Sequence, residues 1–361
     1  MHRASLRRAA ALIAAASIAC SGASREDPTP ASAVASSVSA PAPAPAPMSA
    51  ERVRIVLAAS FGTDGTCRKK QLSGCDLFVA EYDLASMTLL SAERVTGEAG
   101  VAEDFPILDP GGRYVIYQRE RVGRGAQHDL RYVSLTSGEE GTLVEHAREA
   151  ALSHDGSLLA YTAYRPQRTF DIRLHPVTVS ADGVPQLGPA ETLLGDGSSS
   201  EPYFMPGDEA VAYYHKGERA KTGQTRIHSR AGADEDFSQA DGCAHGSVSP
   251  SGTRMFCQSS GKLQYREKQD SRWSPLQTRS FPSPEDPAFA SCDRITFGHP
   301  EFCGSDDLVL TTYTCMNNNT LENAQMMLFD WNSGVVAHLT REMAAALGQE
   351  GEARSGACVR L

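Results

Sequence analysis

Side chains that can bind a metal recur at one position of a repeated pattern in this chain. The position four residues before each of five similar turns holds Phe105, Glu149, Glu201, His245 and His299. Imidazole nitrogen and carboxylate oxygen together suit first-row metals such as Zn, Mn or Fe. If these positions converge on one axis, His245, His299 and Glu201 would form a divalent-metal site. The alternative is that the same groups end strands and hydrogen-bond water.

Other arrangements that could support catalysis are weaker. The chain has no GxSxG elbow for a nucleophilic serine and no CxxC pair for a zinc ribbon or a redox motif. Asp104 and Arg148, one residue earlier in the repeated pattern, could form an ordinary ion pair. We therefore assign no catalytic residue from the sequence.

The elements that would position these side chains are short strands in a repeated order. Each repeat has an apolar segment, a turn with Asp, Pro, Gly or Ser, and a strand of alternating apolar residues. The copies are DFPILDPGGRYVIYQRE at 104–120, EAALSHDGSLLAYTAY at 149–164, EPYFMPGDEAVAYYH at 201–215, HGSVSPSGTRMFCQS at 245–259 and HPEFCGSDDLVLTTY at 299–313. Successive turns lie 44 to 54 residues apart, and a strand-built repeat of about this length is typical of a β-propeller blade.

The pattern predicts an all-β fold over 51–361, a six-bladed β-propeller of four-stranded antiparallel blades. Tyr117, Tyr161 and Tyr213 share a column, which we interpret as packing between blades. The first blade, about 51–96, has no innermost strand of its own. After a short helix near 341–347, the tail 353–361 resembles the other inner strands. We expect this tail to join the first blade and close the ring, leaving no long exposed edge.

Three pairs of segments carry a family resemblance. LDPGGRYVIY with HDLRYVSL, LSHDGSLLAY with FDIRLHPV, and VSPSGTRMF are similar to the Pro-Asp-type, WD40-like propeller repeats of the TolB C-terminal domain. The resemblance implies a fold that serves scaffolds, peptidase gates and some lyases. This chain has a linker where TolB has an N-terminal α/β domain. Among related folds, oligogalacturonate lyases place metal-binding histidines on the axis, and only His299 with Pro300 resembles that arrangement.

The N-terminus is read as a targeting segment. Three arginines precede an apolar run, Ala9–Ala19, that is too short to span a bilayer. Residues 17–20 resemble a lipoprotein signal, which implies removal of 1–19 and lipidation of Cys20. Ser17 stands where leucine is usual, so cleavage by the ordinary signal peptidase is the alternative. Ser21 after the cysteine resembles the outer-membrane class.

A linker follows this targeting segment. Residues 20–50 are rich in Ala, Pro and Ser and end in PAPAPAP. Such a composition buries too little apolar surface to fold and favours an extended chain. We expect a semi-rigid tether between a membrane and the propeller.

Charge and cysteine content indicate the compartment. The formal net charge is −10, without a Lys/Arg block after the signal, which argues against nucleic-acid binding. Apart from Cys20 the chain has eight cysteines, and an even number of cysteines in an exported chain predicts disulfides. Nearness in sequence favours the pairs Cys67–Cys75, Cys243–Cys257, Cys292–Cys303 and Cys315–Cys358, although other pairings are possible.

These observations favour binding over catalysis. We expect a monomeric outer-membrane lipoprotein of the bacterial cell envelope, facing the periplasm or the surface, that binds an envelope protein, a peptide or a glycan. A cofactor is not required by this interpretation. The alternative is a metal-dependent enzyme such as a polysaccharide lyase, with Glu149, Glu201, His245 and His299 around a divalent metal in the central channel.

Overall fold

A computed structural model describes residues 51–61, 75–97, 101–121, 128–165, 169–216, 223–232, 234–235, 244–259, 262–270, 272–279, 292–317 and 320–361. All of them belong to one compact unit, Met48–Leu361. The predicted signal peptide, Cys20 and the tether lie outside these ranges. Within the described ranges, no helix has the length and hydropathy needed to cross a membrane.

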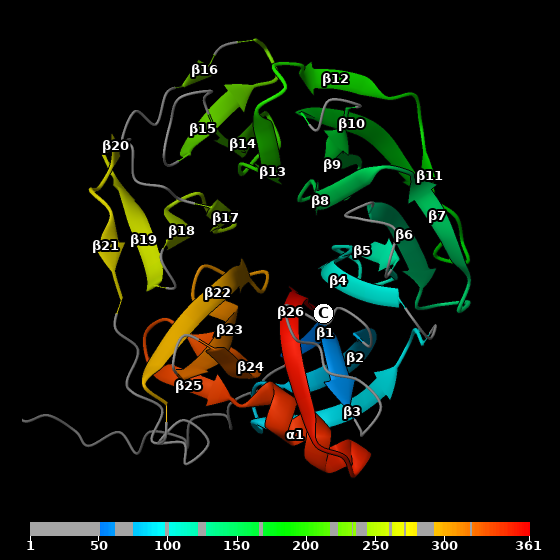
Figure 1. The fold of residues 1–361 in the computed structure, drawn as a ribbon, viewed down its shortest axis with the longest axis vertical. Coiled ribbons are helices and arrows are strands. Elements are labelled where there is room, and N and C mark those ends of the chain that lie inside the picture. Colours follow the sequence, from blue (N-terminus) through cyan, green and yellow to red (C-terminus); the bar gives the residue numbers. More distant parts are fainter. Residues whose placement is uncertain are drawn as a thin grey trace, which may run out of the picture. The chain divides into compact units, whose positions relative to one another are not determined.

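The described strands form six antiparallel sheets that radiate about a common axis, as the repeats predicted (Figure 1). Blade one contains β26 (Gly351–Arg360), β1 (Arg52–Phe61), β2 (Asp76–Asp83) and β3 (Thr88–Arg94). Blade two contains β4 (Val101–Leu108), β5 (Tyr114–Arg121), β6 (His128–Ser134) and β7 (Glu140–Val144). Blade three contains β8 (Ala147–Leu152), β9 (Leu158–Tyr164), β10 (Phe170–Val179), β11 (Pro185–Leu187) and β12 (Glu191–Leu194).

The second half of the ring repeats this order. Blade four contains β13 (Ser199–Phe204), β14 (Ala210–His215), β15 (Gln224–Ser229) and β16 (Asp234–Glu235). Blade five contains β17 (Ala244–Val248), β18 (Arg254–Ser259), β19 (Lys262–Gln269), β20 (Arg272–Trp273) and β21 (Gln277–Thr278). Blade six contains β22 (Arg294–Phe302), β23 (Leu308–Asn317), β24 (Thr320–Asp330) and β25 (Gly334–Ala337). In blades three and five two short strands share the outer position, where four-stranded blades were expected.

The C-terminal strand closes the ring, as predicted. β26 pairs with β1 along its whole length and lies at the inner edge of blade one (Figure 1). The preceding helix α1 (Leu339–Leu347) ends at Gly348, whose left-handed φ of 68° is favoured by glycine. Leu339 and Met343 of α1 are fully buried in a cluster that joins blades six and one.

Packing between blades supplies the core. Tyr117, Tyr161 and Tyr213 are 0 to 2% exposed, which confirms that this column packs between sheets. Separate apolar clusters join blade one to two, two to three, three to four, and five to six. Each blade therefore depends on its neighbours, because its own two faces become buried only when adjacent sheets cover them.

Two disulfides differ from the pairing that nearness in sequence favoured. Cys292 pairs with Cys315 and Cys303 with Cys358, at Cα–Cα distances of 5.4 and 4.9 Å. The predicted pairs Cys292–Cys303 and Cys315–Cys358 are wrong because spatial nearness follows the strand ladder and the ring. Cys315 faces Ile295 across the β22–β23 ladder, near Cys292, and closure brings β26 beside blade six. Cys75 is also disulfide-bonded, whereas Cys67 and the side chains of Cys243 and Cys257 lie outside the described residues.

Candidate functional site

The inner strand of every blade contains a β-bulge at the same place. The ladder register shifts at Asp104/Ile107, Arg148/Ala150, Ser200/Tyr203, Ala244/Ser247 and Gly298/Glu301, and on β1 at Ala58/Ala59 opposite β26. Phe105, Glu149, Glu201 and His299 have φ of 49°, 47°, 53° and 49°, which is uncommon for residues other than glycine. A bulge re-aims the side chain it carries. Four members of the predicted column therefore line one compartment of the central channel.

Hydrogen bonds from adjacent blades hold the bulged backbone. The Phe105 N–H donates to Ser355 Oγ at 3.0 Å and the Glu201 N–H donates to Thr162 Oγ1 at 3.0 Å. The Glu149 N–H donates to the Gln118 side-chain oxygen at 3.3 Å. Because each acceptor belongs to the preceding blade in the ring, the positions of these side chains depend on ring assembly.

The sixth position of the column is Arg354, which the repeat pattern did not predict. Ala58 of β1 faces Ser355, and the next residue, Ala59, faces Ala353. Arg354, between them, is therefore the bulged residue of β26. Its guanidinium lies 3.1 Å from Asp104 Oδ2, and Ser355 Oγ donates a hydrogen bond to the other carboxylate oxygen, Asp104 Oδ1. Arg148 instead lies 3.3 Å from Glu149. The suggested pair of Asp104 with Arg148 is therefore replaced by two pairs, because β26 places a closer cation beside Asp104.

The Glu149 carboxyl of the predicted column has a raised pKa. Burial raises its pKa to about 7, and the neighbouring Glu201 carboxylate adds to the rise, while Arg148 opposes it. Thr162 Oγ1 donates a hydrogen bond to Glu149 Oε2 at 3.3 Å. A carboxyl in this state exchanges a proton near neutral pH.

Glu301 is a further carboxyl in the channel that the turn alignment missed. It lies two residues after His299, on the far side of the bulge in β22. Burial raises its pKa to about 8, and a hydrogen bond from Ser247 opposes the shift. The feature of the sequence that could have identified Glu301 is its polar side chain within the otherwise apolar stretch that follows the bulge.

Two compartments of the channel share part of their lining. The inner compartment, about 80 Å³, is lined by Phe105, Glu149, Glu201 and His299 together with Glu301, Ser355 and neighbouring residues such as Pro106 and Tyr203. The outer compartment, about 340 Å³, is lined by residues of the inner strands and presents polar and apolar surface in about equal parts; Pro110, His154 and Pro250 lie among the turns at its end. Ile107, Ala150, Pro202, Tyr203, Gly246 and Glu301 line both compartments.

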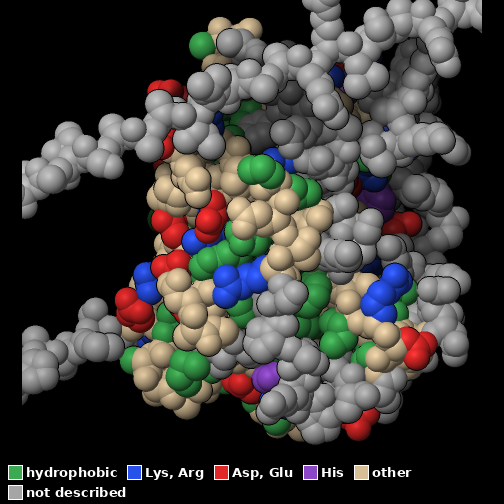
Figure 2. All heavy atoms as spheres, turned by 90° about the vertical axis from the view of Figure 1, so that its left-hand side faces the viewer, with side chains coloured by type: hydrophobic (Ala, Val, Ile, Leu, Met, Phe, Trp, Pro, Cys, Tyr) green, Lys and Arg blue, Asp and Glu red, His purple; other side chains and the backbone are tan. Residues whose placement is uncertain are grey.

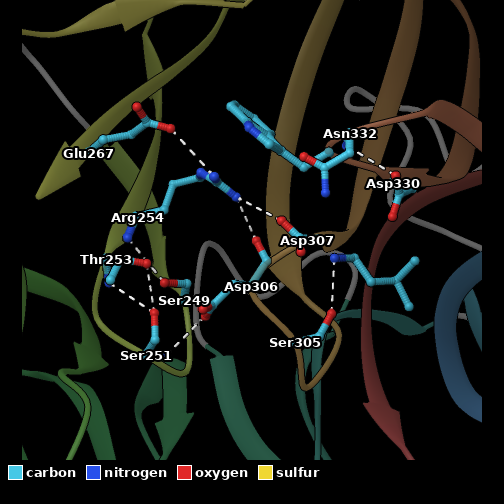
Figure 3. Close-up of polar contacts among 12 residues, drawn as sticks. Ser249, Ser251, Thr253, Arg254, Glu267, Ser305, Asp306, Asp307, Asp330 and Asn332 are labelled. Atoms are coloured by element: carbon cyan, nitrogen blue, oxygen red, sulfur yellow. Dashed lines mark hydrogen bonds and ion pairs between the residues drawn. The ribbon is translucent and has the colours of Figure 1, made fainter. Parts of the chain in front are cut away.

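Turns of adjacent blades interlock around this outer end. The His154 Nδ1 lies 2.8 Å from Asp208 Oδ1, and the His154 backbone N–H donates to the same oxygen at 2.9 Å. The Ser251 N–H donates to Asp306 Oδ1 at 3.0 Å (Figure 3). Both aspartates occupy the same turn position, in blades four and six. Each one hydrogen-bonds the turn of the preceding blade.

The contact between blades five and six continues outward along Arg254. This guanidinium donates to the Asp306 carbonyl at 2.7 Å and lies 3.4 Å from Glu267 and 3.5 Å from Asp307 (Figure 3). It also lies 4.2 Å from the centre of the Trp331 ring, a cation–π contact.

On the described part of the side shown in Figure 2, acidic and basic side chains are interspersed.

The predicted metal site is only partly within the described structure. Glu149, Glu201 and His299 share the inner compartment, whereas the side chain of His245 lies outside the described residues. Among the residues that the structure describes, no three His, Cys, Asp or Glu side chains are grouped closely enough to hold a metal ion. The metal site thus remains a prediction.

Comparison with known proteins supports the fold. No family model matches the chain, and no curated protein matches it. TolB from Acinetobacter baumannii is similar with a TM-score of 0.55 and 12% identity, over 85% of this chain and 66% of that chain. The putative TolB from Agrobacterium tumefaciens has a TM-score of 0.43 and 15% identity, over 63% of this chain and 88% of that chain. The chain thus has the TolB-like six-bladed propeller fold, and identities this low show the fold alone.

Proposed function

We propose that this protein is an exported, membrane-anchored propeller of the cell envelope that binds a protein, a peptide or a glycan at its channel. The observation that carries the proposal is the outer compartment. Its volume of about 340 Å³ lies in the range of ligand pockets, about 300 to 1,000 Å³. Its walls come from inner strands of several blades, so the closed ring is needed to form it.

Disulfides support the proposed location. Cys292–Cys315 and Cys303–Cys358 join residues that are distant in sequence. Structural disulfides persist in oxidising compartments and are rare in the cytosol. Lipidation of Cys20 and the outer membrane as the destination belong to the proposal on the basis of the sequence.

Substitutions at the mouth of the channel test the proposed binding. Pro110 and Pro250 are exposed residues of the turns at this mouth. We expect Pro110→Trp and Pro250→Trp to reduce recovery of crosslinked partners from isolated envelopes several-fold. Ala181→Trp is the matched control, because Ala181 occupies the same turn position in an exposed hairpin between β10 and β11.

The possible outcomes separate the parts of the proposal. Equal recovery with all four proteins would show that partners do not use this mouth. Failure of the wild-type protein to recover any partner would overturn the binding function.

A metal-dependent enzyme, such as a polysaccharide lyase, is the alternative. It is favoured by His299, Glu149 and Glu201 lining one compartment. Elemental analysis of protein purified without chelator should then show about one equivalent of metal. His245→Ala and His299→Ala should each remove it, whereas wild-type protein without metal would overturn this alternative.

A further inference from the structure

The first residue of the turn in blade six forms a covalent bond instead of capping the turn. The Cys303 N–H donates to the Leu308 carbonyl at 2.8 Å, and Ser249 begins the turn of blade five in the same way. The Ser249 hydroxyl also accepts a hydrogen bond from the N–H five residues later, at 3.1 Å. In blade six the equivalent N–H, that of Leu308, donates to Ser305 Oγ at 3.1 Å. Another residue thus caps this turn, and the Cys303 sulfur is bonded to Cys358 of β26.

Gly304 allows the same turn to approach β26 closely. Its φ of 68° lies in the left-handed region that favours glycine. A Cβ atom at this position would lie 3.1 Å from the Arg360 Cβ and 3.2 Å from the Arg360 backbone nitrogen. Pro110, Pro206 and Pro250 occupy this position in three other blades, and the proline ring excludes such a φ. The turn of blade six therefore differs from these turns at the point where it contacts β26.

The disulfide holds β26 close to the free end of the chain. Cys358 is three residues from the C-terminal Leu361. A terminal strand opens from its free end, because the last residues lose few contacts when they leave the ladder. Beyond Cys358 the contacts are the Leu361 N–H with the Arg52 carbonyl, at 2.8 Å, and a partly exposed ion pair of Arg360 with Glu51, and such exposed pairs contribute little. The disulfide therefore stops opening of β26 at Cys358.

Departure of β26 would remove one wall of the channel. This strand is the innermost strand of blade one. Its residues Ser355 and Gly356 line the inner compartment, and the next four, 357–360, line the outer compartment. Both compartments therefore require β26 to remain in its ladder with β1.

We propose that the Cys303–Cys358 disulfide is a redox-sensitive latch that keeps the ring, and with it the channel, closed. In the oxidised protein β26 stays paired with β1. In the reduced protein β26 separates from β1 from its C-terminal end. Cys303 and Cys358 are 0% and 7% exposed, so a reductant reaches the sulfurs while the end of β26 is open. The latch itself is independent of the proposed function, whereas its effect on binding rests on that function.

Reduction of the latch is a thiol–disulfide exchange with a dithiol. A thiolate of the dithiol attacks one sulfur and forms a mixed disulfide, while the other sulfur leaves as a thiolate and takes up a proton. The second thiol of the reductant then attacks the mixed disulfide and releases the second cysteine. Two cysteine thiols replace one disulfide, and the dithiol, which becomes a disulfide, supplies both electrons and both protons.

Hydrogen exchange of the full-length protein, measured by mass spectrometry, tests the latch. In Cys303→Ala/Cys358→Ala we expect the amides of residues 353–360 to exchange at least tenfold faster than in wild type. The amides of β14 in blade four should be unchanged. Cys292→Ala/Cys315→Ala is the matched control, because it removes a disulfide within blade six, and it should leave exchange of β26 unchanged.

Reduction by dithiothreitol separates loss of the bond from loss of the side chains. In the Cys292→Ala/Cys315→Ala protein it should accelerate exchange of β26 to the same extent, and reoxidation should reverse the change. Agreement with Cys303→Ala/Cys358→Ala assigns the effect to the latch, because Cys75 is also disulfide-bonded and is reduced only in the second experiment. If circular dichroism shows that Cys303→Ala/Cys358→Ala is unfolded, the reduction experiment alone decides.

Equal exchange of β26 in the oxidised and reduced proteins would overturn the latch. Equally fast exchange of β26 in the two double variants would also overturn it, because loss of either disulfide would then loosen the strand. Recovery of crosslinked envelope partners should fall several-fold for Cys303→Ala/Cys358→Ala. Unchanged recovery despite a loosened β26 would reject control of binding by the latch. Failure of wild type to recover a partner would instead overturn the proposed function and leave the exchange result standing.

Discussion

Buried carboxyl groups are the most informative single residues in this propeller. Glu103 is 1% exposed between blades one and two. Burial raises its pKa to about 7; the hydrogen bond from Thr96 and the charge of Arg119 oppose the rise, while nearby Asp76 and Glu140 reinforce it. A folded-state pKa above the unfolded value of about 4.3 means that the folded protein holds the proton more tightly. The contribution of the Glu103 carboxyl to folding stability is therefore fully present below about pH 4 and is lost as pH rises through 7.

Substitution of Glu103 isolates this effect. Without the ionisable group, the free energy of unfolding should decrease less as pH rises. Glu103→Gln should therefore become more stable relative to wild type between pH 5 and pH 8. The rise in pKa from about 4.3 to about 7 corresponds to at most roughly 4 kcal/mol. Urea unfolding at the two pH values measures the difference. Glu93→Gln on β3, where Glu93 is exposed, is the control, and an identical pH dependence in Glu103→Gln and wild type would contradict the argument.

At the scale of residues, alignment of the repeats predicted which side chains share the channel, but it did not explain their backbone conformation. Phe105, Glu149, Glu201 and His299 were expected on one channel, and they line one compartment. Their positive φ values could not be read from residue types, because bulky side chains disfavour that conformation. Glu301 and Arg354 were missed because a bulge shifts the alternation of side chains, and a strict period of two does not include such a shift.

Among the elements, β26 contacts three blades of the ring. It supplies the innermost strand of blade one, and its residues reach both neighbouring blades. Ser355 Oγ donates to Asp104 in blade two. Thr312 Oγ1 in blade six donates to the Arg354 carbonyl at 2.9 Å. The Cys303–Cys358 disulfide adds a covalent link between blade six and this strand.

The two disulfides should differ in their contribution to stability. Cys303–Cys358 closes a separation of 55 residues across the ring junction, and Cys292–Cys315 closes 23 residues within blade six. The chain-entropy relation gives about 4.2 kcal/mol for the first and about 3.4 kcal/mol for the second. We therefore expect Cys303→Ala/Cys358→Ala to lower the urea midpoint more than Cys292→Ala/Cys315→Ala does. Equal or reversed effects would show that the ring junction gains no particular stability from its disulfide.

At the scale of the whole molecule, stability depends on closure. Every apolar cluster described above spans two blades, and the largest joins blades six and one through β26 and α1. Opening this junction would expose the β1 edge and its buried neighbours. An unpaired strand edge of this kind promotes association with other chains.

Deletion of residues 351–361 tests the importance of closure. We expect the truncated protein to form oligomers or aggregates on size-exclusion chromatography, because β1 loses its inner partner. A synthetic peptide of residues 351–361 should restore part of the monomer by occupying the vacant edge. Deletion of Leu361 alone, which is 49% exposed, should leave the monomer unchanged. A monomeric truncated protein with wild-type stability would contradict the role of β26.

The sequence by itself determined the number of blades, the second-strand columns and closure by the C-terminal tail. These features depend on local alternation and on a repeat length, which are linear properties of the chain. Only the tertiary structure decided the disulfide pairs, the bulges that turn side chains into the channel, and the placement of Arg354 and Glu301. Those features depend on which strands become neighbours when the ring closes, and distance along the chain carries no measure of that.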